Sequence, residues 1–440
     1  MSIDDEFNRN CDKNYNIQPT IYPPKERIIA IGDIHGDMNL AINFLKKGKV
    51  IKEICNQYFD NKYIKEHKYM LNIQTNGLEH IITDNIMEFD QSINQANIVY
   101  RYYEVFNSSS STELDDYYIK VIQEDNNPNN INTSEDSLKK CELIDKFRWF
   151  KWIGLSTHVV QVGDQIDRCR PFGENTCEMT KTTLKDEDSD LEIMLLYDSL
   201  DKIAQYKNGR VISLLGNHEI MNVVGDMRYV SNKGGLDFSP EPKDYEKGIN
   251  IRKNVFASTI ALKMSCTRST VVVIGEYLFV HGGIANKLAY KYKLLDINQI
   301  IRKFLNKTAK HNKDLNDLLH SSKYSPLWHR KLAYIPPDIN KQQHHNCKTL
   351  YEPTIENINK FNPELTMQLN GIIVGHTPQF IAFNKGITTA CNDRIIRVDI
   401  GASKAFDVFQ PNIVDSFSTF NSSRLPQVAE IMNGKIKILI

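Results

Sequence analysis

The sequence lacks any run of about eighteen apolar residues, the length that a membrane-spanning helix needs. It also lacks a net charge, because 54 Lys and Arg balance 54 Asp and Glu, and its pI is about 7.2. Bulk charge therefore does not hold this chain on nucleic acid or on an anionic membrane, and we expect neither partner. The N-terminal stretch is polar and has no apolar segment of the kind found in secretory signals.

Cysteine is present but forms no Cys-x-x-Cys pair. Eight cysteines are scattered along the chain, at positions 11, 55, 141, 169, 177, 266, 347 and 391. In a long chain without a visible signal, such scattering is typical of free thiols rather than of a disulfide framework or a zinc site. We therefore expect a reducing, cytoplasmic compartment.

Five short apolar segments each run directly into a turn that combines glycine with Asp, Asn or His. The turns are Gly32–Gly36, Gly163–Arg168, Gly216–Glu219, His281–Gly283 and Gly375–Thr377. Continuous apolar runs of this length favour strands that are buried on both faces. Polar side chains just beyond such strands are typical of an α/β sheet whose site lies at the strand ends. The pattern therefore predicts an α/β fold with one site built from all five turns.

The polar side chains in these turns are oxygen and imidazole donors. The candidate ligands are Asp33, His35, Asp164, Asn217, His281 and His376. This donor set suits divalent Mn, Fe or Zn, and six donors are enough for two ions that share one carboxylate. Two such ions lower the pKa of a shared water, and the resulting hydroxide can attack phosphorus in line.

The same motifs, in the same order, resemble the calcineurin-like metallophosphoesterases of the phosphoprotein phosphatase (PPP) group. The resemblance spans residues 26 to about 402. Four further stretches, Asn217–Val230, Ser325–Arg330, Val374–Gln379 and Arg397–Gly401, resemble the Shewanella-like phosphatase branch.

The resemblance implies roles for individual residues. Asp33, His35 and Asp164 would hold one metal, and Asp164, Asn217, His281 and His376 would hold the other. His218 would be the general acid, with Asp167 orienting it. Arg168 and Arg330 would bind the phosphate, because guanidinium groups bind phosphoryl oxygens through paired hydrogen bonds. Two plainer readings stay open: Asp167–Arg168 as a simple ion pair, and Arg330 as a surface arginine. Cys169 departs from the family, which commonly has glycine there.

The resemblance implies a four-layer α/β/β/α sandwich with mixed sheets, which the apolar segments also favour. We divide the chain into an irregular leader (1–25), a catalytic domain (26–402) and a C-terminal β-hairpin extension (403–440). A polar insertion at about 55–137 interrupts the catalytic domain, and we expect one or two helices there, roughly at 78–106. The spacing of apolar residues predicts an amphipathic helix at 137–152.

The expected function is that of a dinuclear-metal phosphomonoesterase, a protein phosphatase that hydrolyses phospho-Ser/Thr or phospho-Tyr by metal-activated hydroxide. Its partner would be a phosphoprotein or phosphopeptide substrate. Two alternatives stay open: a diadenosine-polyphosphate hydrolase on the same fold, and a catalytically silent scaffold that keeps the phosphatase fold.

Overall fold

The computed structural model describes most of the chain. The described residues are 11, 17–54, 62–72, 75–84, 97–107, 114–122, 147–241, 243–338, 342, 344–382, 384–409 and 424–440. Everything below concerns these residues.

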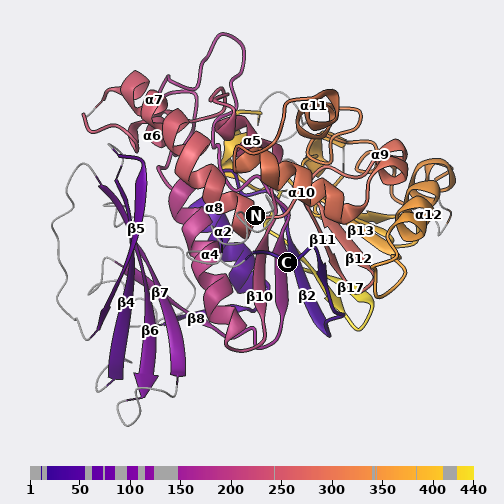
Figure 1. Cartoon of the computed structure of the whole chain (residues 1–440), viewed down its shortest axis with the longest axis horizontal. Helices are drawn as coiled ribbons and strands as arrows, with labels where there is room; N and C mark the ends of the chain where they lie inside the picture. Colours follow the sequence, from indigo (N-terminus) through magenta and orange to yellow (C-terminus); the bar gives the residue numbers. More distant parts are fainter. Residues whose placement is uncertain are drawn as a thin grey trace.

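Two mixed sheets form the centre of the molecule (Figure 1). The first has the order β10-β9-β2-β16-β17, with β2 at Arg27–Ile31, β9 at His158–Gln161, β10 at Arg210–Ser213, β16 at Val428–Met432 and β17 at Lys435–Leu439. The second has the order β1-β11-β12-β13-β15-β14, with β1 at Ile21–Tyr22, β11 at Val271–Ile274, β12 at Tyr277–Val280, β13 at Gly371–Val374, β14 at Thr388–Ala390 and β15 at Ile395–Arg397. Strands β2, β9 and β10 run parallel, as do β12 and β13, so their carboxyl ends meet at shared edges.

Successive side chains along each strand point to opposite faces of the sheet, so each sheet contributes to a core on both of its faces. Ile28 and Ala30 of β2 face a core that also contains Val272 and Phe279 of the second sheet. The sheets therefore pack face to face, and each has an outer face covered by helices.

The outer face of the first sheet packs against α2 (Met38–Lys47) and α4 (Asp190–Gln205). The outer face of the second sheet packs against α8 (Ala261–Thr267), α10 (Leu294–Leu305), α11 (Lys313–His320) and α12 (Glu352–Phe361). The remaining helices are α5 (Asn217–Val223), α6 (Asn232–Leu236), α7 (Tyr245–Val255), α9 (Asn286–Lys291) and the short segments η2 (Phe256–Ile260), η3 (Cys347–Tyr351), η4 (Gln379–Ala382) and η5 (Lys404–Phe409). The predicted four-layer α/β/β/α architecture is confirmed.

The chain ends join the first sheet and the second. The hairpin β16–β17 continues the first sheet, because β16 pairs antiparallel with β2, and Glu430 accepts a 2.7 Å hydrogen bond from Arg27. Residues 21–22, inside the predicted irregular leader, pair with β11 as β1.

The prediction of helices in the insertion is wrong for its described residues. A third, antiparallel sheet occupies this region, with the order β3-β8-β7-β6-β4-β5. Its strands are β3 (Ile51–Ile54), β4 (Lys62–Asn72), β5 (Gly77–Asp84), β6 (Asn97–Asn107), β7 (Leu114–Ile122) and β8 (Phe147–Trp152). Strands β6, β7 and β8 contact α4, and the sheet lies at one side of the molecule (Figure 1).

The physical reason lies in composition and period. Strand β6 is rich in tyrosine and valine, which favour strands. In β8, which replaces the end of the predicted 137–152 helix, Phe150 and Trp152 are both buried, as two-residue alternation requires. Residues 85–96 and 137–146 of the two predicted helical stretches lie outside the described residues.

The prediction of free thiols is also wrong for six of the cysteines. Three disulfides are present: Cys11–Cys266, Cys169–Cys177 and Cys347–Cys391. The pairing brings together cysteines up to 255 residues apart, which no local spacing reveals. The free-thiol argument for a reducing compartment therefore fails, since such disulfides are typical of oxidising compartments. Cys55 and Cys141 lie outside the described residues.

Among the described helices, none is long and apolar enough to cross a membrane.

Phe279 provides a test of the sheet-on-sheet core, because it is fully buried between the two central sheets. We expect Phe279→Ala to lower the free energy of unfolding by about 3–5 kcal/mol, since it removes a large apolar side chain and leaves a cavity. The matched control is Phe172→Ala, at a side chain that is 47% exposed, where we expect a loss of about 1 kcal/mol or less. Urea unfolding followed by tryptophan fluorescence measures both. Equal losses would contradict this account of the core.

Candidate active site

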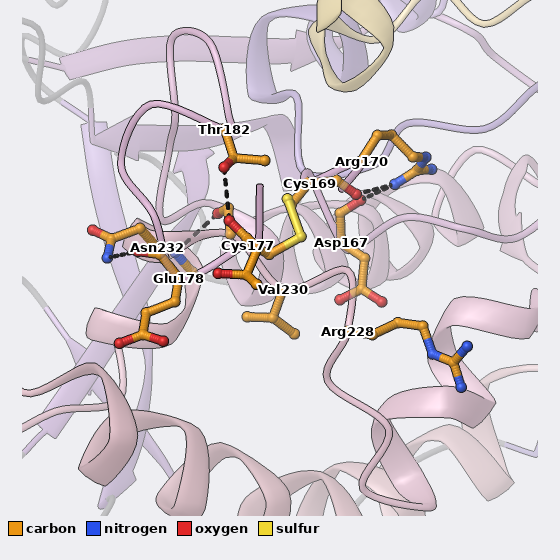
Figure 2. Close-up of a disulfide and its surroundings, with 12 residues drawn as sticks. Asp167, Cys169, Arg170, Cys177, Glu178, Thr182, Arg228, Val230 and Asn232 are labelled. Carbon is orange, nitrogen blue, oxygen red and sulfur yellow. Dashed lines mark hydrogen bonds between the residues drawn. A yellow bond between two sulfur atoms is a disulfide. The ribbon is translucent and has the colours of Figure 1, made fainter. Parts of the chain in front are cut away.

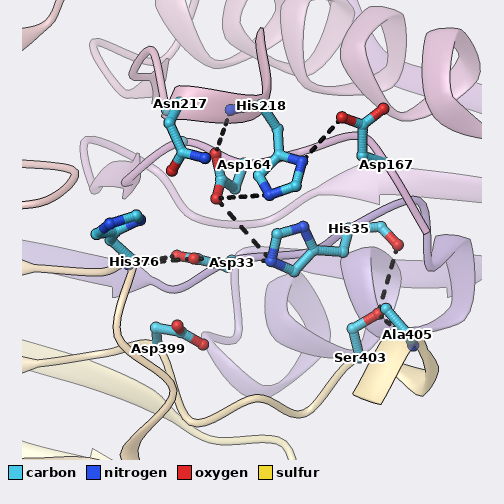
Figure 3. A network of polar contacts seen from close by, with 12 residues as sticks. Asp33, His35, Asp164, Asp167, Asn217, His218, His376, Asp399, Ser403 and Ala405 are labelled. Carbon is cyan, nitrogen blue, oxygen red and sulfur yellow. Dashed lines mark hydrogen bonds and ion pairs between the residues drawn. The ribbon is translucent and has the colours of Figure 1, made fainter. Parts of the chain in front are cut away.

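The five turns named from the sequence meet at one edge of the two central sheets. Asp33 and His35 follow β2, Asp164 follows β9, and Asn217 follows β10. His281 follows β12 and His376 follows β13. All six candidate ligands are at least 95% buried, and Figure 3 shows five of them, all but His281, around the Asp164 carboxylate.

Asp164 occupies the centre of this cluster. Its Oδ2 lies 3.2 Å from His281 Nε2, 3.8 Å from His218 Nε2 and 4.0 Å from His35 Nε2. Two groups of donors could each hold a metal ion, namely His35, Asp164 and His218, and Asp164, His281 and His376. Asp164 belongs to both groups, whereas the first group contains His218 and not Asp33, the third ligand expected there from the sequence.

Backbone carbonyls fix the imidazole rings. His281 Nδ1 lies 2.9 Å from the carbonyl oxygen of Val162, and His35 Nδ1 lies 3.2 Å from that of Ile166. When Nδ1 carries a proton that the carbonyl accepts, Nε2 is the nitrogen that faces Asp164 and can bind a cation. Metal-binding histidines in proteins are oriented in this way.

Asp33 and His376 complete the second side of the cluster. The His376 backbone N–H donates to Asp33 Oδ2 at 3.1 Å, while the buried His376 Nε2 has no hydrogen-bond partner among the described residues. His281 Nε2 also lies 3.0 Å from Asn217 Oδ1. A buried nitrogen without a partner costs free energy, and a cation would satisfy it.

The pKa shifts show how crowded the carboxylates are. Burial, followed by Asp399 and Asp164, raises the pKa of Asp33 well above its usual range. Burial acts in the same direction on Asp164, but His281, His218 and His35 outweigh it and hold the pKa of Asp164 well below its usual range. Because clustered carboxylates repel one another, a divalent cation would stabilise the charged forms. The donor set and its crowding therefore both fit a cation site.

Unusual backbone conformations in the turns bring the candidate ligands close together. His35, Asp164, Asp167 and His376 have φ values of 50°, 55°, 72° and 63°, a region that non-glycine residues rarely adopt. Such strain clusters at functional sites because the surrounding fold must hold it in place.

Two motif glycines allow the close approach expected from the sequence. A Cβ at Gly216 would lie 2.1 Å from Asp164 Oδ1, and a Cβ at Gly375 would lie 2.5 Å from Asp33 Oδ1. Glu219, fully buried, accepts hydrogen bonds from the backbone N–H groups of Asp164 and Gly216 at 3.0 and 2.7 Å. Glycine and glutamate together hold the Asp164 turn against the start of α5.

His218 lies beside Asp167, the residue expected to orient it. Its Nδ1 lies 2.8 Å from Asp167 Oδ2, which leaves Nε2 facing Asp164. Asp167 is held in turn by Asn222 Nδ2 at 3.0 Å and by the fully buried Arg252 at 3.3 Å. Arg252 also contacts Asp190 at 2.7 Å. The orienting carboxylate therefore belongs to a buried network that extends to α4 and α7.

The two predicted phosphate-binding arginines lie differently. Arg330 Nη1 donates to the carbonyl of His376 and, at 3.2 Å, to Thr377 Oγ1, which places Arg330 beside the cluster. Arg168 instead donates to the carbonyls of Gly36 and Lys185, both at 2.7 Å. The structure therefore brings Arg330 to the site and directs the Arg168 guanidinium to the surrounding loops.

Several residues of the site were missed from the sequence. Glu219 carries a signal, because a glutamate three residues after a helix N-cap is typical of a capping box. Asp399, whose pKa is raised to about 6 by burial, belongs to the quoted Arg397–Gly401 stretch but received no role. Arg252 and Arg170 had no sequence signal, because only the fold brings them to the site.

A family model described as calcineurin-like phosphoesterase matches residues 142–380, more than half of the chain. The chain belongs to the calcineurin-like phosphoesterase family. The predicted family is thereby confirmed for this phosphoesterase.

Two individual proteins are similar to this chain in sequence. The phosphoesterase is 28% identical over 327 residues to Shewanella-like protein phosphatase 2 of Arabidopsis thaliana, covering 64% of this chain and 71% of the relative. It is 33% identical over 266 residues to uncharacterized protein R398 of Acanthamoeba polyphaga mimivirus, covering 55% of this chain and 96% of the relative. The Arabidopsis relative confirms the predicted resemblance to the Shewanella-like branch.

Solved structures support the fold. A crystal structure of a mutant cold-active protein tyrosine phosphatase aligns with a TM-score of 0.50 and 16% identity, over 97% of this chain and 83% of the other. At this identity the likeness concerns the fold alone.

The buried Asp167–Arg252–Asp190 network can be tested through stability. We expect Arg252→Met to lower the free energy of unfolding by about 3–5 kcal/mol, because it leaves two buried carboxylates without their cation. The matched control is Arg228→Ala, where an exposed arginine pairs with Asp226 and its loss leaves stability almost unchanged. Urea unfolding measures both variants, and an unaffected Arg252→Met would contradict the assigned contacts.

Proposed function

We propose that this phosphoesterase is a metal-dependent protein phosphatase that hydrolyses phosphomonoesters on a protein or peptide substrate. The observation that carries the proposal is the Asp164 carboxylate, which belongs to two adjacent groups of potential metal ligands. The family match and relatives named as protein phosphatases support the same reaction class.

Asp33, His35 and Asp164 would hold one divalent cation, and Asp164, Asn217, His281 and His376 the other, with Mn, Fe and Zn as the candidates. Such a pair of cations supplies Lewis-acid activation of water for in-line attack on phosphorus. The carbonyls of Val162 and Ile166 keep His281 and His35 oriented for this task.

His218 would supply the proton for the leaving group. Asp167 accepts from Nδ1, so a protonated imidazole presents its second proton at Nε2, on the side of the cluster. Proton donation to the leaving oxygen makes the departing alcohol a better leaving group. Asn222 and Arg252 keep Asp167 in place and thereby keep the His218 ring in one orientation.

Arg330 would bind the phosphoryl group from the His376 side. Its guanidinium is partly exposed and lies against the His376 carbonyl and the Thr377 hydroxyl. A guanidinium at this position can donate further hydrogen bonds to an anionic substrate, and these bonds strengthen as charge develops in the transition state.

Asp164→Asn tests the proposal. We expect loss of both bound cations and a fall in phosphopeptide turnover of at least about 100-fold, because one side chain serves both ligand groups. The measurements are metal analysis of the purified protein and phosphate release with added Mn²⁺. The matched control is Asp226→Asn, at a side chain that pairs with exposed Arg228, which should keep both cations and the wild-type rate.

The substrate comparison uses the same wild-type protein. Faster turnover of a dinucleotide polyphosphate than of phospho-Ser, phospho-Thr and phospho-Tyr peptides would replace the protein-phosphatase proposal with a nucleotide hydrolase. No turnover of any of these substrates, or of p-nitrophenyl phosphate, would favour a silent scaffold.

A further inference from the structure

Two arginines flank Cys169, and their guanidinium groups have different surroundings. Arg168 is 1% exposed, and both of its terminal nitrogens are engaged by the protein. Nη1 donates to the Gly36 carbonyl, and Nη2 donates to the Lys185 carbonyl and lies 3.1 Å from Glu187 Oε1. These bonds join the turn after β2 to the loop before α4 and occupy both terminal nitrogens, while the buried Nε has no hydrogen-bond partner among the described residues.

Arg170 lies between two aromatic rings that pack against residues of the site. Its guanidinium carbon lies 5.4 Å from the ring centre of Tyr229 and 4.8 Å from that of Phe406. The Tyr229 ring packs 5.0 Å from the His218 ring, and the Phe406 ring packs 5.4 Å from the His35 ring. The guanidinium is therefore bracketed by two rings that touch, respectively, the proposed proton donor and a proposed metal ligand.

The electrostatics agree with this placement. After burial, the Arg170 charge is the strongest influence that lowers the pKa of His35. Asp164 and Asp167 are, in turn, the charged groups that most strongly counter the effect of burial on Arg170. Arg170 thus supplies positive charge to the same side of the cluster that His35 and His218 form.

Only one of its nitrogens is used by the protein. Nη1 donates to the carbonyls of Cys169 and Asp167, at 2.7 and 3.0 Å, while Nε and Nη2 make no hydrogen bond with any described residue. The aromatic contacts fix the plane of the guanidinium and leave these two donors available. A planar pair of donors matches the geometry of two phosphoryl oxygens.

The Cys169–Cys177 disulfide fixes the chain between the two arginines (Figure 2). Both cysteines are buried, and the Cys169 backbone N–H donates to the Tyr229 carbonyl at 3.0 Å. The disulfide thus joins the segment that carries Arg170 to the loop at Cys177, and the backbone hydrogen bond holds it next to the segment that carries Tyr229.

We propose that Arg170, and not Arg168, is the arginine of this segment that binds the phosphoryl oxygens, while Arg168 is a positioning residue that holds two loops together. The inference rests on the proposed phosphatase function. It assigns binding to a residue outside the Gly163–Arg168 motif, in addition to Arg330 beside His376.

The test measures binding of inorganic phosphate to the Mn²⁺-loaded protein by calorimetry, together with KM and kcat on a phosphopeptide and the melting temperature. We expect Arg170→Met to weaken phosphate binding and raise KM by about 10-fold or more, as for loss of charge-assisted hydrogen bonds. Methionine keeps the apolar contacts with Tyr229 and Phe406 but loses the two hydrogen bonds from Nη1, so the melting temperature should fall by no more than it does in Arg168→Lys. Arg170→Lys should restore only part of the affinity, because lysine keeps the charge but lacks the planar pair of donors.

Arg168→Lys should give the opposite pattern, with a lower melting temperature and a phosphate affinity within about threefold of wild type, because its contacts are with backbone and Glu187. Arg228→Ala removes one exposed positive charge and controls for net charge. The proposal is overturned if Arg170→Met binds phosphate as tightly as wild type, or if Arg168→Lys weakens phosphate binding more than Arg170→Met does.

Failure of the proposed function gives a different result. A wild-type protein that releases no phosphate from any ester would contradict the phosphatase proposal. Calorimetry with inorganic phosphate would still support the assignment of Arg170 if Arg170→Met alone lost affinity, and would overturn it if Arg170→Met did not.

Discussion

The Asp164 carboxylate is the feature on which the site depends. One of its oxygens accepts the His218 backbone N–H at 3.0 Å, and the other is surrounded by imidazole nitrogens from three different turns. Placing a negative charge inside a protein is costly unless hydrogen bonds and positive charge surround it. Here the backbone adopts a left-handed conformation at Asp164, and Glu219 holds the turn from behind. A strained backbone conformation and buried hydrogen bonds therefore hold the Asp164 carboxylate where the two sheets meet.

The orientation of the surrounding groups follows from contacts outside this centre. Main-chain carbonyls orient two histidines through Nδ1, while Asp167 orients His218, and Arg252 joins Asp167 to Asp190 on α4. Each of these contacts is buried, so water does not compete for it, and each ring has one preferred orientation. The side chains that would bind the cations and orient the proton donor are thus already in place before a substrate binds.

The surroundings of the site depend on long-range pairing. The third sheet, built from the insertion, contacts α4, and the Cys169–Cys177 disulfide fixes the chain that leaves the Asp164–Asp167 turn. The two arginines beside that disulfide have different partners: Arg168 donates to the carbonyls of Gly36 and Lys185, and Arg170 packs between the aromatic rings of Tyr229 and Phe406. Arg168 and Arg170 are close in the sequence, but their partners come from segments far apart in the chain.

The sequence by itself determined the family, the four-layer architecture and the set of residues that meet around Asp164, because those residues sit in short turns directly after apolar strands, where local pattern and tertiary position coincide. The sequence also indicated Glu219, because it stands three residues after Gly216, as the glutamate of a capping box does. Tertiary structure alone decided three other matters: that the insertion forms an antiparallel sheet, that six described cysteines are paired, and that Arg170, rather than Arg168, packs between the rings of Tyr229 and Phe406. The spacing of apolar residues in aromatic-rich segments can fit both a helix and a strand. Only pairing with neighbouring strands decides between the two structures. Disulfide partners and the direction of an arginine depend on which distant segments come into contact, and that information is absent from local spacing.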